Sequence, residues 1–145
     1  MKVWITHKGS TRFETGSDLP VSVLMESAEP AVPEGPRGET PKHLFLQSVA
    51  GCTGLDVILI LEKMRAPLPR NFRIEVEAPL TEEHPKVFTS FELTYLVEGE
   101  LDADKFIRAV TLSQEKYCGI SAMFRKIAPL SWRVLLNGKE IAMGN

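Results

Sequence analysis

The stretch that decides the fold is residues 40–67, which read TPKHLFLQSVAGCTGLDVILILEKMRAP. Thr40 followed by Pro41 is typical of a helix start, because the hydroxyl caps the first turn and the proline stands where no amide hydrogen is needed. Pro67 stops the pattern, so the sequence predicts one helix over about residues 41–65. The helix is apolar enough to raise the question of a membrane span, but an acid near its middle makes a span costly. We expect a long central helix that is buried on most sides within protein.

Upstream of this helix, the sequence favours three short strands and then a loop. Residues 3–7 and 12–15 flank a turn, and in residues 21–25 the apolar Val21, Val23 and Met25 alternate with Ser22 and Leu24. Four prolines and two glycines in residues 28–41 predict a loop or arm.

Downstream, alternating apolar residues predict strands, and a helical spacing of apolar residues predicts two further helices. Asp102 is placed to cap the first of these helices. The last predicted strand meets Asn137-Gly138, a two-residue turn signal. The predicted strands are 72–78, 87–97 and 132–136, and the predicted helices are 102–117 and 120–127.

This order, βββ-α-ββ-αα-β, predicts an α+β fold with antiparallel sheets. The length suits one domain over residues 1–145, although an intertwined dimer would suit it as well. Within that domain we expect a β-meander at 1–27, a Pro/Gly-rich arm at 28–41 and an α-ββ-αα-β core at 42–145.

The charge balance excludes two classes of partner. The chain has 17 basic and 19 acidic side chains and a net charge of −2. It therefore lacks the excess of positive charge that would attract nucleic acid or an anionic membrane. Residues 1–20 lack the pattern of a secretory signal, so we expect a cytoplasmic protein. In that compartment, a disulfide is more plausible as a transient catalytic state than as a permanent crosslink.

The chain has only two cysteines, Cys52 and Cys118, which form a candidate redox pair if folding brings them together. The alternative is that Cys52 is a small core residue without a chemical role. The three histidines could join the cysteines as zinc ligands, but no close pair of ligands exists in the sequence. We therefore expect no metal and no cofactor.

Two motifs carry a family resemblance. Residues 40–53 resemble the helix motif of the OsmC/Ohr family, the osmotically inducible protein C and organic hydroperoxide resistance proteins. Residues 115–123 resemble that family's second cysteine motif, and residues 82–88 resemble a segment of its less characterised branch. The resemblance implies an intertwined α+β homodimer with two active sites at the subunit interface. It implies that Cys52 is peroxidatic, that Cys118 is resolving, and that an external dithiol restores both.

The resemblance also implies an arginine that activates the first cysteine and is held by a glutamate near the start of the long helix. The corresponding positions here are Lys42 and His43, so that carboxylate is absent. Arg12 and Arg37 are the candidate cations. Asp56 lies one helical turn after Cys52, where an ionised carboxylate opposes thiolate formation.

The expected pocket combines two titratable groups with an apolar lining. His43 stands where relatives place the carboxylate and could tune the site with pH, while Asp56 could instead pair with a cation across the dimer. The apolar lining would favour an organic hydroperoxide. Its predicted residues are Phe45, Val49, Met123 and Phe124.

The leading hypothesis is thus a cytoplasmic, homodimeric thiol peroxidase that reduces organic hydroperoxides. Two alternatives stay open: a binding module for a small apolar or acidic ligand, and a redox sensor that forms the disulfide without turnover.

Overall fold

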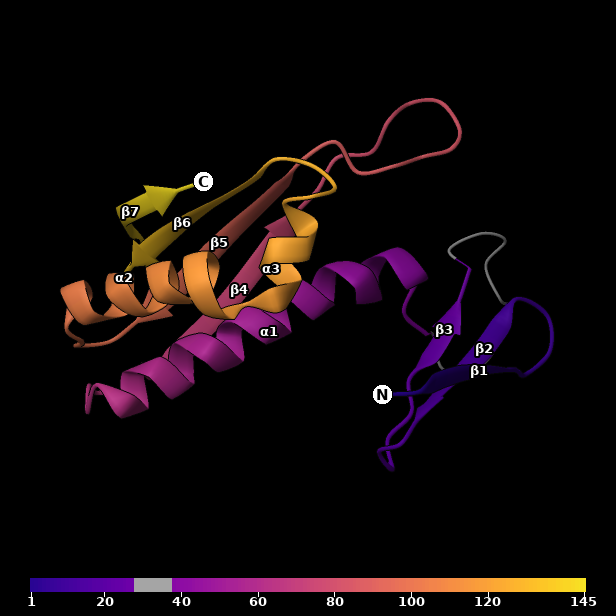
Figure 1. Cartoon of the computed structure of the whole chain (residues 1–145), viewed down its shortest axis with the longest axis horizontal. Helices are drawn as coiled ribbons and strands as arrows, with labels where there is room; N and C mark the ends of the chain where they lie inside the picture. The colour runs from indigo at the N-terminus through magenta and orange to yellow at the C-terminus, as the bar shows by residue number, and fades with distance from the viewer. Residues whose placement is uncertain (28–37) are drawn as a thin grey trace. The chain divides into compact units, whose positions relative to one another are not determined.

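The computed structural model describes residues 1–27 and 38–145, and the chain divides into two compact units, Met1–Leu46 and Gln47–Asn145 (Figure 1). The predicted α+β class is confirmed, since three strands precede a long helix that is followed by strands and shorter helices. Most of the predicted arm, residues 28–37, lies outside the described residues.

The first unit contains a three-stranded antiparallel sheet of β1 (Val3–His7), β2 (Arg12–Ser17) and β3 (Leu24–Glu26), in that order. This is the predicted meander, although β3 is shorter and later than the alternation at 21–25 indicates. The turn between β1 and β2 uses positive φ angles of 96° at Gly9 and 50° at Ser10, a region where glycine is unstrained.

Helix α1 spans Pro41–Lys63, close to its predicted bounds. Its cap is confirmed, because the His43 backbone N–H donates to the Thr40 hydroxyl at 3.3 Å. The expectation of burial on most sides is wrong for the single chain: Leu55 is 68% exposed and Leu59 is 52% exposed. By length and composition alone α1 could cross a membrane, with a mean hydropathy of 1.9, and 28% of that window is buried.

The second unit contains a four-stranded sheet in the order β4 (Asn71–Glu77), β5 (Phe91–Glu98), β6 (Leu130–Leu136) and β7 (Lys139–Gly144). Two predictions need correction. The sheet is mixed, since β5 and β6 are parallel, and β7 follows the Asn137-Gly138 turn where no strand was predicted. The parallel pair follows from the helices between β5 and β6, which return the chain to the edge where β5 began.

Those connecting helices are α2 (Ala103–Leu112) and α3 (Gly119–Phe124), with a π-helical turn at Ser113–Tyr117 between them. Asp102 caps α2 as predicted, accepting from the Lys105 backbone N–H at 3.0 Å. The predicted helix 102–117 is therefore correct in place, but its last turn is wider than an α-helix.

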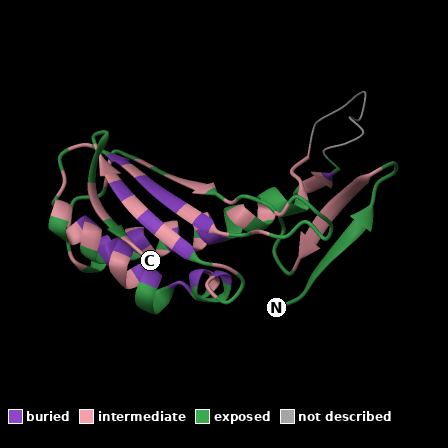
Figure 2. Ribbon diagram, turned by 90° about the horizontal axis from the view of Figure 1, so that it is seen from above, coloured by how far each residue is buried: buried purple, intermediate pink, exposed green. Residues whose placement is uncertain are grey.

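The helices of the second unit pack on one face of its sheet, and the buried residues concentrate between these layers (Figure 2). Phe72 of β4 meets Phe106 of α2 with ring centroids 5.5 Å apart, and Phe91 of β5 meets Phe124 of α3 at 4.6 Å. From β5, Tyr95 reaches α1 through a hydrogen bond to Thr53. This packing fixes α1, α2 and α3 relative to one another.

Candidate functional site

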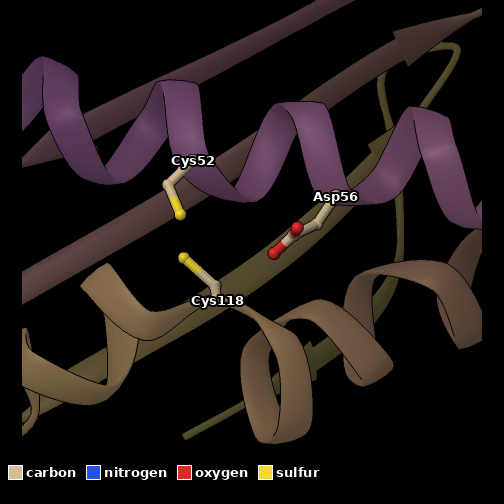
Figure 3. Close-up of side chains that lie close together, drawn as sticks. All are labelled: Cys52, Asp56 and Cys118. Carbon is tan, nitrogen blue, oxygen red and sulfur yellow. The ribbon is translucent and has the colours of Figure 1, made fainter.

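The two cysteines face each other across the second unit (Figure 3). Cys52 projects from the middle of α1, and Cys118 stands between the π-helical turn and α3. Their sulfur atoms and a carboxylate oxygen of Asp56 all lie within 4.8 Å of one another. Both cysteines are free thiols; Cys52 is half-buried and Cys118 is 3% exposed. The fold therefore brings Cys52 and Cys118 close together, as the sequence predicted.

The π-helical turn is what aims Cys118. The Cys118 backbone N–H donates to the Ser113 carbonyl at 2.8 Å, and this bond closes a turn one residue wider than an α-helical turn. The chain is extended at Cys118, whose Sγ caps α3 by accepting from the Ser121 backbone N–H at 3.3 Å. The predicted position near the start of a short helix is confirmed.

The surroundings of Cys52 favour its protonated thiol. Burial raises the pKa of Cys52 above its ordinary value, and so do a hydrogen bond with the Cys118 side chain and the nearby charge of Asp56. A backbone hydrogen bond from Ile120 lowers the pKa and offsets part of this shift. The predicted opposition of Asp56 is confirmed, and the Ile120 amide is a stabilising group that the sequence did not reveal.

A buried hydrogen-bond network surrounds the site. The Thr53 hydroxyl lies 2.6 Å from the Tyr95 hydroxyl and 2.8 Å from the Ser113 hydroxyl. Ser113 donates to Asp56 at 3.1 Å, and the Gln114 amide donates to both Thr53 and Tyr95. Burial raises the pKa of Tyr95 to about 12, so its phenol stays protonated at neutral pH. The network ties α1, β5 and the π-helical turn together.

Chemistry fixes the direction of these bonds. An ionised Asp56 only accepts, so Ser113 spends its single proton there and must accept from Thr53. Thr53 then accepts from Tyr95. At the far end, Arg125 donates to the Gln114 side-chain oxygen at 3.1 Å, which turns the amide nitrogen toward Thr53. The donors therefore form a chain in which each group donates to the next, and the chain ends at the Asp56 carboxylate.

Of the two predicted cations, the structure describes Arg12, and Arg37 lies outside the described residues. In the first unit, the Arg12 Nε donates to Glu26 at 3.2 Å, and Glu26 is 6% exposed. Glu26 is a carboxylate that the sequence reasoning missed, because nothing in its spacing links it to Arg12; the register of β2 and β3 sets them opposite each other.

The predicted pocket residues differ in exposure. Val49 and Phe124 are buried in the core, whereas Met123 is 53% exposed. In the first unit, the His43 imidazole lies 3.3 Å from the Glu39 carboxylate, and Phe45 is exposed. Of the predicted pocket residues, Asp56 places a carboxylate oxygen within 4.8 Å of both sulfur atoms.

A hollow of about 380 Å³ opens beside Asp56 in the second unit. It is mostly apolar, and one lysine is among its lining residues. None of its apolar residues was predicted, because residues of α1, α2 and the π-helical turn meet there only in the fold. The lining residues are Asp56, Leu59, Ile60, Lys63, Met64, Leu112 and Tyr117.

Comparisons with known proteins agree on the family. Residues 34–133 match the family of OsmC-like proteins. Protein YhfA of Escherichia coli K12 is 35% identical over 97 residues, which cover 63% of this chain and 69% of YhfA. A hypothetical protein of Aquifex aeolicus VF5 has a crystal structure that superposes with a TM-score of 0.75 at 26% identity, covering 94% of this chain and 96% of that one.

The organic hydroperoxide resistance protein OhrB of Bacillus subtilis has the same fold, with a TM-score of 0.61 at 19% identity over 93% of this chain and 98% of OhrB. The family match spans well over half of the chain and includes both cysteine motifs. This protein belongs to the family of OsmC-like proteins.

Proposed function

We propose that this protein reduces organic hydroperoxides with Cys52 and Cys118. The observation that carries the proposal is the approach of the two sulfurs, which with Asp56 lie within 4.8 Å of one another although they are far apart in sequence. Structural neighbours named organic hydroperoxide resistance proteins support the same chemistry.

The reaction balances without a metal or an organic cofactor. The Cys52 thiolate attacks the O–O bond of ROOH, which releases the alcohol ROH after protonation and leaves Cys52 as a sulfenic acid. The Cys118 thiol then attacks that sulfur, forming the disulfide and releasing water. An external dithiol reduces the disulfide and is itself oxidised, which restores both thiols.

Activation of Cys52 has to overcome its raised pKa. The Ile120 amide supplies one favourable hydrogen bond to the sulfur. Arg12 is the proposed cation, as the resemblance implies for an arginine, although its carboxylate partner within the first unit is Glu26 of β3 and not a residue near the start of the long helix. Arg37 stays the alternative.

The hollow beside Asp56 supports an organic substrate. Its apolar residues would contact a hydrocarbon chain, while the peroxide oxygen reaches the cysteines past Asp56, which borders both. Hydrogen peroxide has no group to occupy this space, so the organic substrate gains binding energy that hydrogen peroxide lacks.

We also propose that the protein works as a cytoplasmic homodimer. The support is α1, whose Leu55 and Leu59 are more than half exposed in the single chain although the helix is strongly apolar. A second copy would cover this face. The thiol chemistry uses the two cysteines of one chain, so it does not depend on whether the active sites lie at the dimer interface.

Turnover tests the function. Reduced protein, cumene hydroperoxide and excess dithiothreitol are mixed, and the remaining hydroperoxide is assayed over time. The proposal predicts many turnovers for the wild type, none for Cys52→Ser, and slower consumption of cumene hydroperoxide when Arg12 is replaced by glutamine. Consumption no faster than in buffer with dithiothreitol would refute it, and equal rates with hydrogen peroxide would refute the preference for organic substrates.

One observation favours a second candidate, a redox sensor. The approach of the two sulfurs is sufficient for one disulfide to form, while the raised pKa of Cys52 opposes rapid turnover. A sensor would form the disulfide with one equivalent of hydroperoxide and would not be reduced by a dithiol on the timescale of the assay.

A further inference from the structure

The reduced site carries three potential metal ligands on two separate segments of the fold. Cys52 and Asp56 lie one turn apart on α1, and Cys118 approaches from the start of α3 (Figure 3). Within the described residues, these three form the one group of histidine, cysteine or acidic side chains whose ligand atoms all lie within 4.8 Å of one another. The sequence predicted no metal here, because its histidines and cysteines form no close pair along the chain.

Each of the three side chains is held by its own hydrogen-bond donor. The Ile120 backbone N–H donates to Cys52, the Ser121 backbone N–H to Cys118 at 3.3 Å, and the Ser113 hydroxyl to Asp56 at 3.1 Å. Donors of this kind orient metal ligands and stabilise their anionic forms.

The charges of the cluster call for a cation. Two thiolates and a carboxylate in one partly buried site repel one another, and a divalent ion removes most of that cost. Two sulfurs and one oxygen suit a borderline-soft ion such as Zn²⁺, with a water as the fourth ligand. Sulfurs in a tetrahedral zinc site lie ~3.8 Å apart, so separations of up to 4.8 Å need only small side-chain rotations.

We propose that reduced Cys52, Cys118 and Asp56 bind one divalent zinc-type ion per chain. The ion enters from the hollow beside Asp56 and displaces one proton from each thiol. It occupies the sulfurs that the peroxide reaction needs, so metal binding and peroxide reduction exclude each other. The proposal requires only the reduced thiols and holds whether or not the protein turns over hydroperoxides.

The test uses the full chain, stripped with a chelator and kept reduced by a phosphine under nitrogen. Cd²⁺ is titrated in while the ultraviolet thiolate-to-metal charge-transfer band is followed, and Zn²⁺ is then used to displace it. We expect one equivalent per chain in the wild type and no high-affinity band in Cys52→Ser or Cys118→Ser. We expect a ten- to hundredfold weaker affinity in Asp56→Asn, and Glu62→Gln, an exposed carboxylate on the same helix, should match the wild type.

Retention of wild-type affinity in either serine variant overturns the proposal, and so does an unchanged affinity in Asp56→Asn, which would leave a site of two thiols only. X-ray absorption of the wild-type zinc protein avoids any dependence on variants that fold poorly. Two sulfur ligands at ~2.3 Å with oxygen at ~2.0 Å support the site. A shell of oxygen and nitrogen alone overturns it.

Discussion

The Ser113 hydroxyl donates a 3.1 Å hydrogen bond to the Asp56 carboxylate, and this bond ties the turn that carries Cys118 to the helix that carries Cys52. Asp56 therefore has two effects. It helps to set the distance between the cysteines, and its charge makes the Cys52 thiolate harder to form. Substitutions that separate the two effects test the account of the site.

Asp56→Asn should speed the first reaction with hydroperoxide, because asparagine keeps an acceptor for Ser113 but removes the charge that raises the pKa of Cys52. A lower pKa raises the thiolate fraction of Cys52, and the lower nucleophilicity of that thiolate offsets part of the gain in rate. The measurement is the loss of thiols in a single turnover with chelator present. Glu62→Gln is the control, and a slower reaction of Asp56→Asn would contradict the role given to the charge.

Thr53→Val should destabilise the protein by about 1–3 kcal/mol, since the isosteric change leaves buried partners at Tyr95 and Ser113 unsatisfied. Urea unfolding of the reduced protein gives the free-energy difference. Thr89→Val is the matched control, because Thr89 is exposed and its hydroxyl donates to the Pro79 carbonyl; the loss of stability should be below about 0.5 kcal/mol. Equal losses in the two variants would argue against a structural role for the network.

Tyr95 should titrate far above an ordinary tyrosine. In the Tyr117→Phe variant it is the one remaining tyrosine, so phenolate absorbance should appear near pH 12 in the folded state, against about 10 after unfolding. Because folding raises this pKa, the stability from the protonated phenol is complete below about pH 10 and is lost as the pH rises through about 12. Phenolate formation near pH 10 in the folded variant would contradict the buried position.

Leu59→Glu should shift the protein from dimer toward monomer, since it places a charge on the exposed apolar face of α1. Sedimentation velocity over a range of concentrations measures the change. Val87→Glu, a substitution of a similarly exposed residue between β4 and β5, should leave the dimer intact. A wild type that sediments as a monomer at high concentration would contradict the proposed assembly.

Local sequence signals predicted much of this fold. The Thr40 cap and following proline located the start of α1, and alternating residues located β1, β2 and β4 within a few positions. The two-residue turn at Asn137-Gly138 was read correctly, with φ angles of 50° and 79°. Strand β7 after it was missed, because its residues carry little apolar alternation.

Long-range relationships were harder to predict. The resemblance indicated that Cys52 and Cys118 meet, and helical spacing placed Asp56 beside Cys52. The sequence could not show the π-helical turn whose Ser113 hydroxyl donates to Asp56. The network from Arg125 to Asp56 uses ordinary polar residues whose partners lie on other elements. The pairing of Arg12 with Glu26 depends on strand register in the same way.

The most direct test of the central claim is the state of the two thiols after one equivalent of cumene hydroperoxide. Reduced protein is treated, alkylated and digested without reductant, and the peptides are identified by mass spectrometry, with isotope-labelled and unlabelled chains mixed to separate bonds within a chain from bonds between chains. The account predicts one Cys52–Cys118 crosslink within each chain and no remaining free thiol. Two intact thiols, or oxidised cysteines without that crosslink, would contradict it.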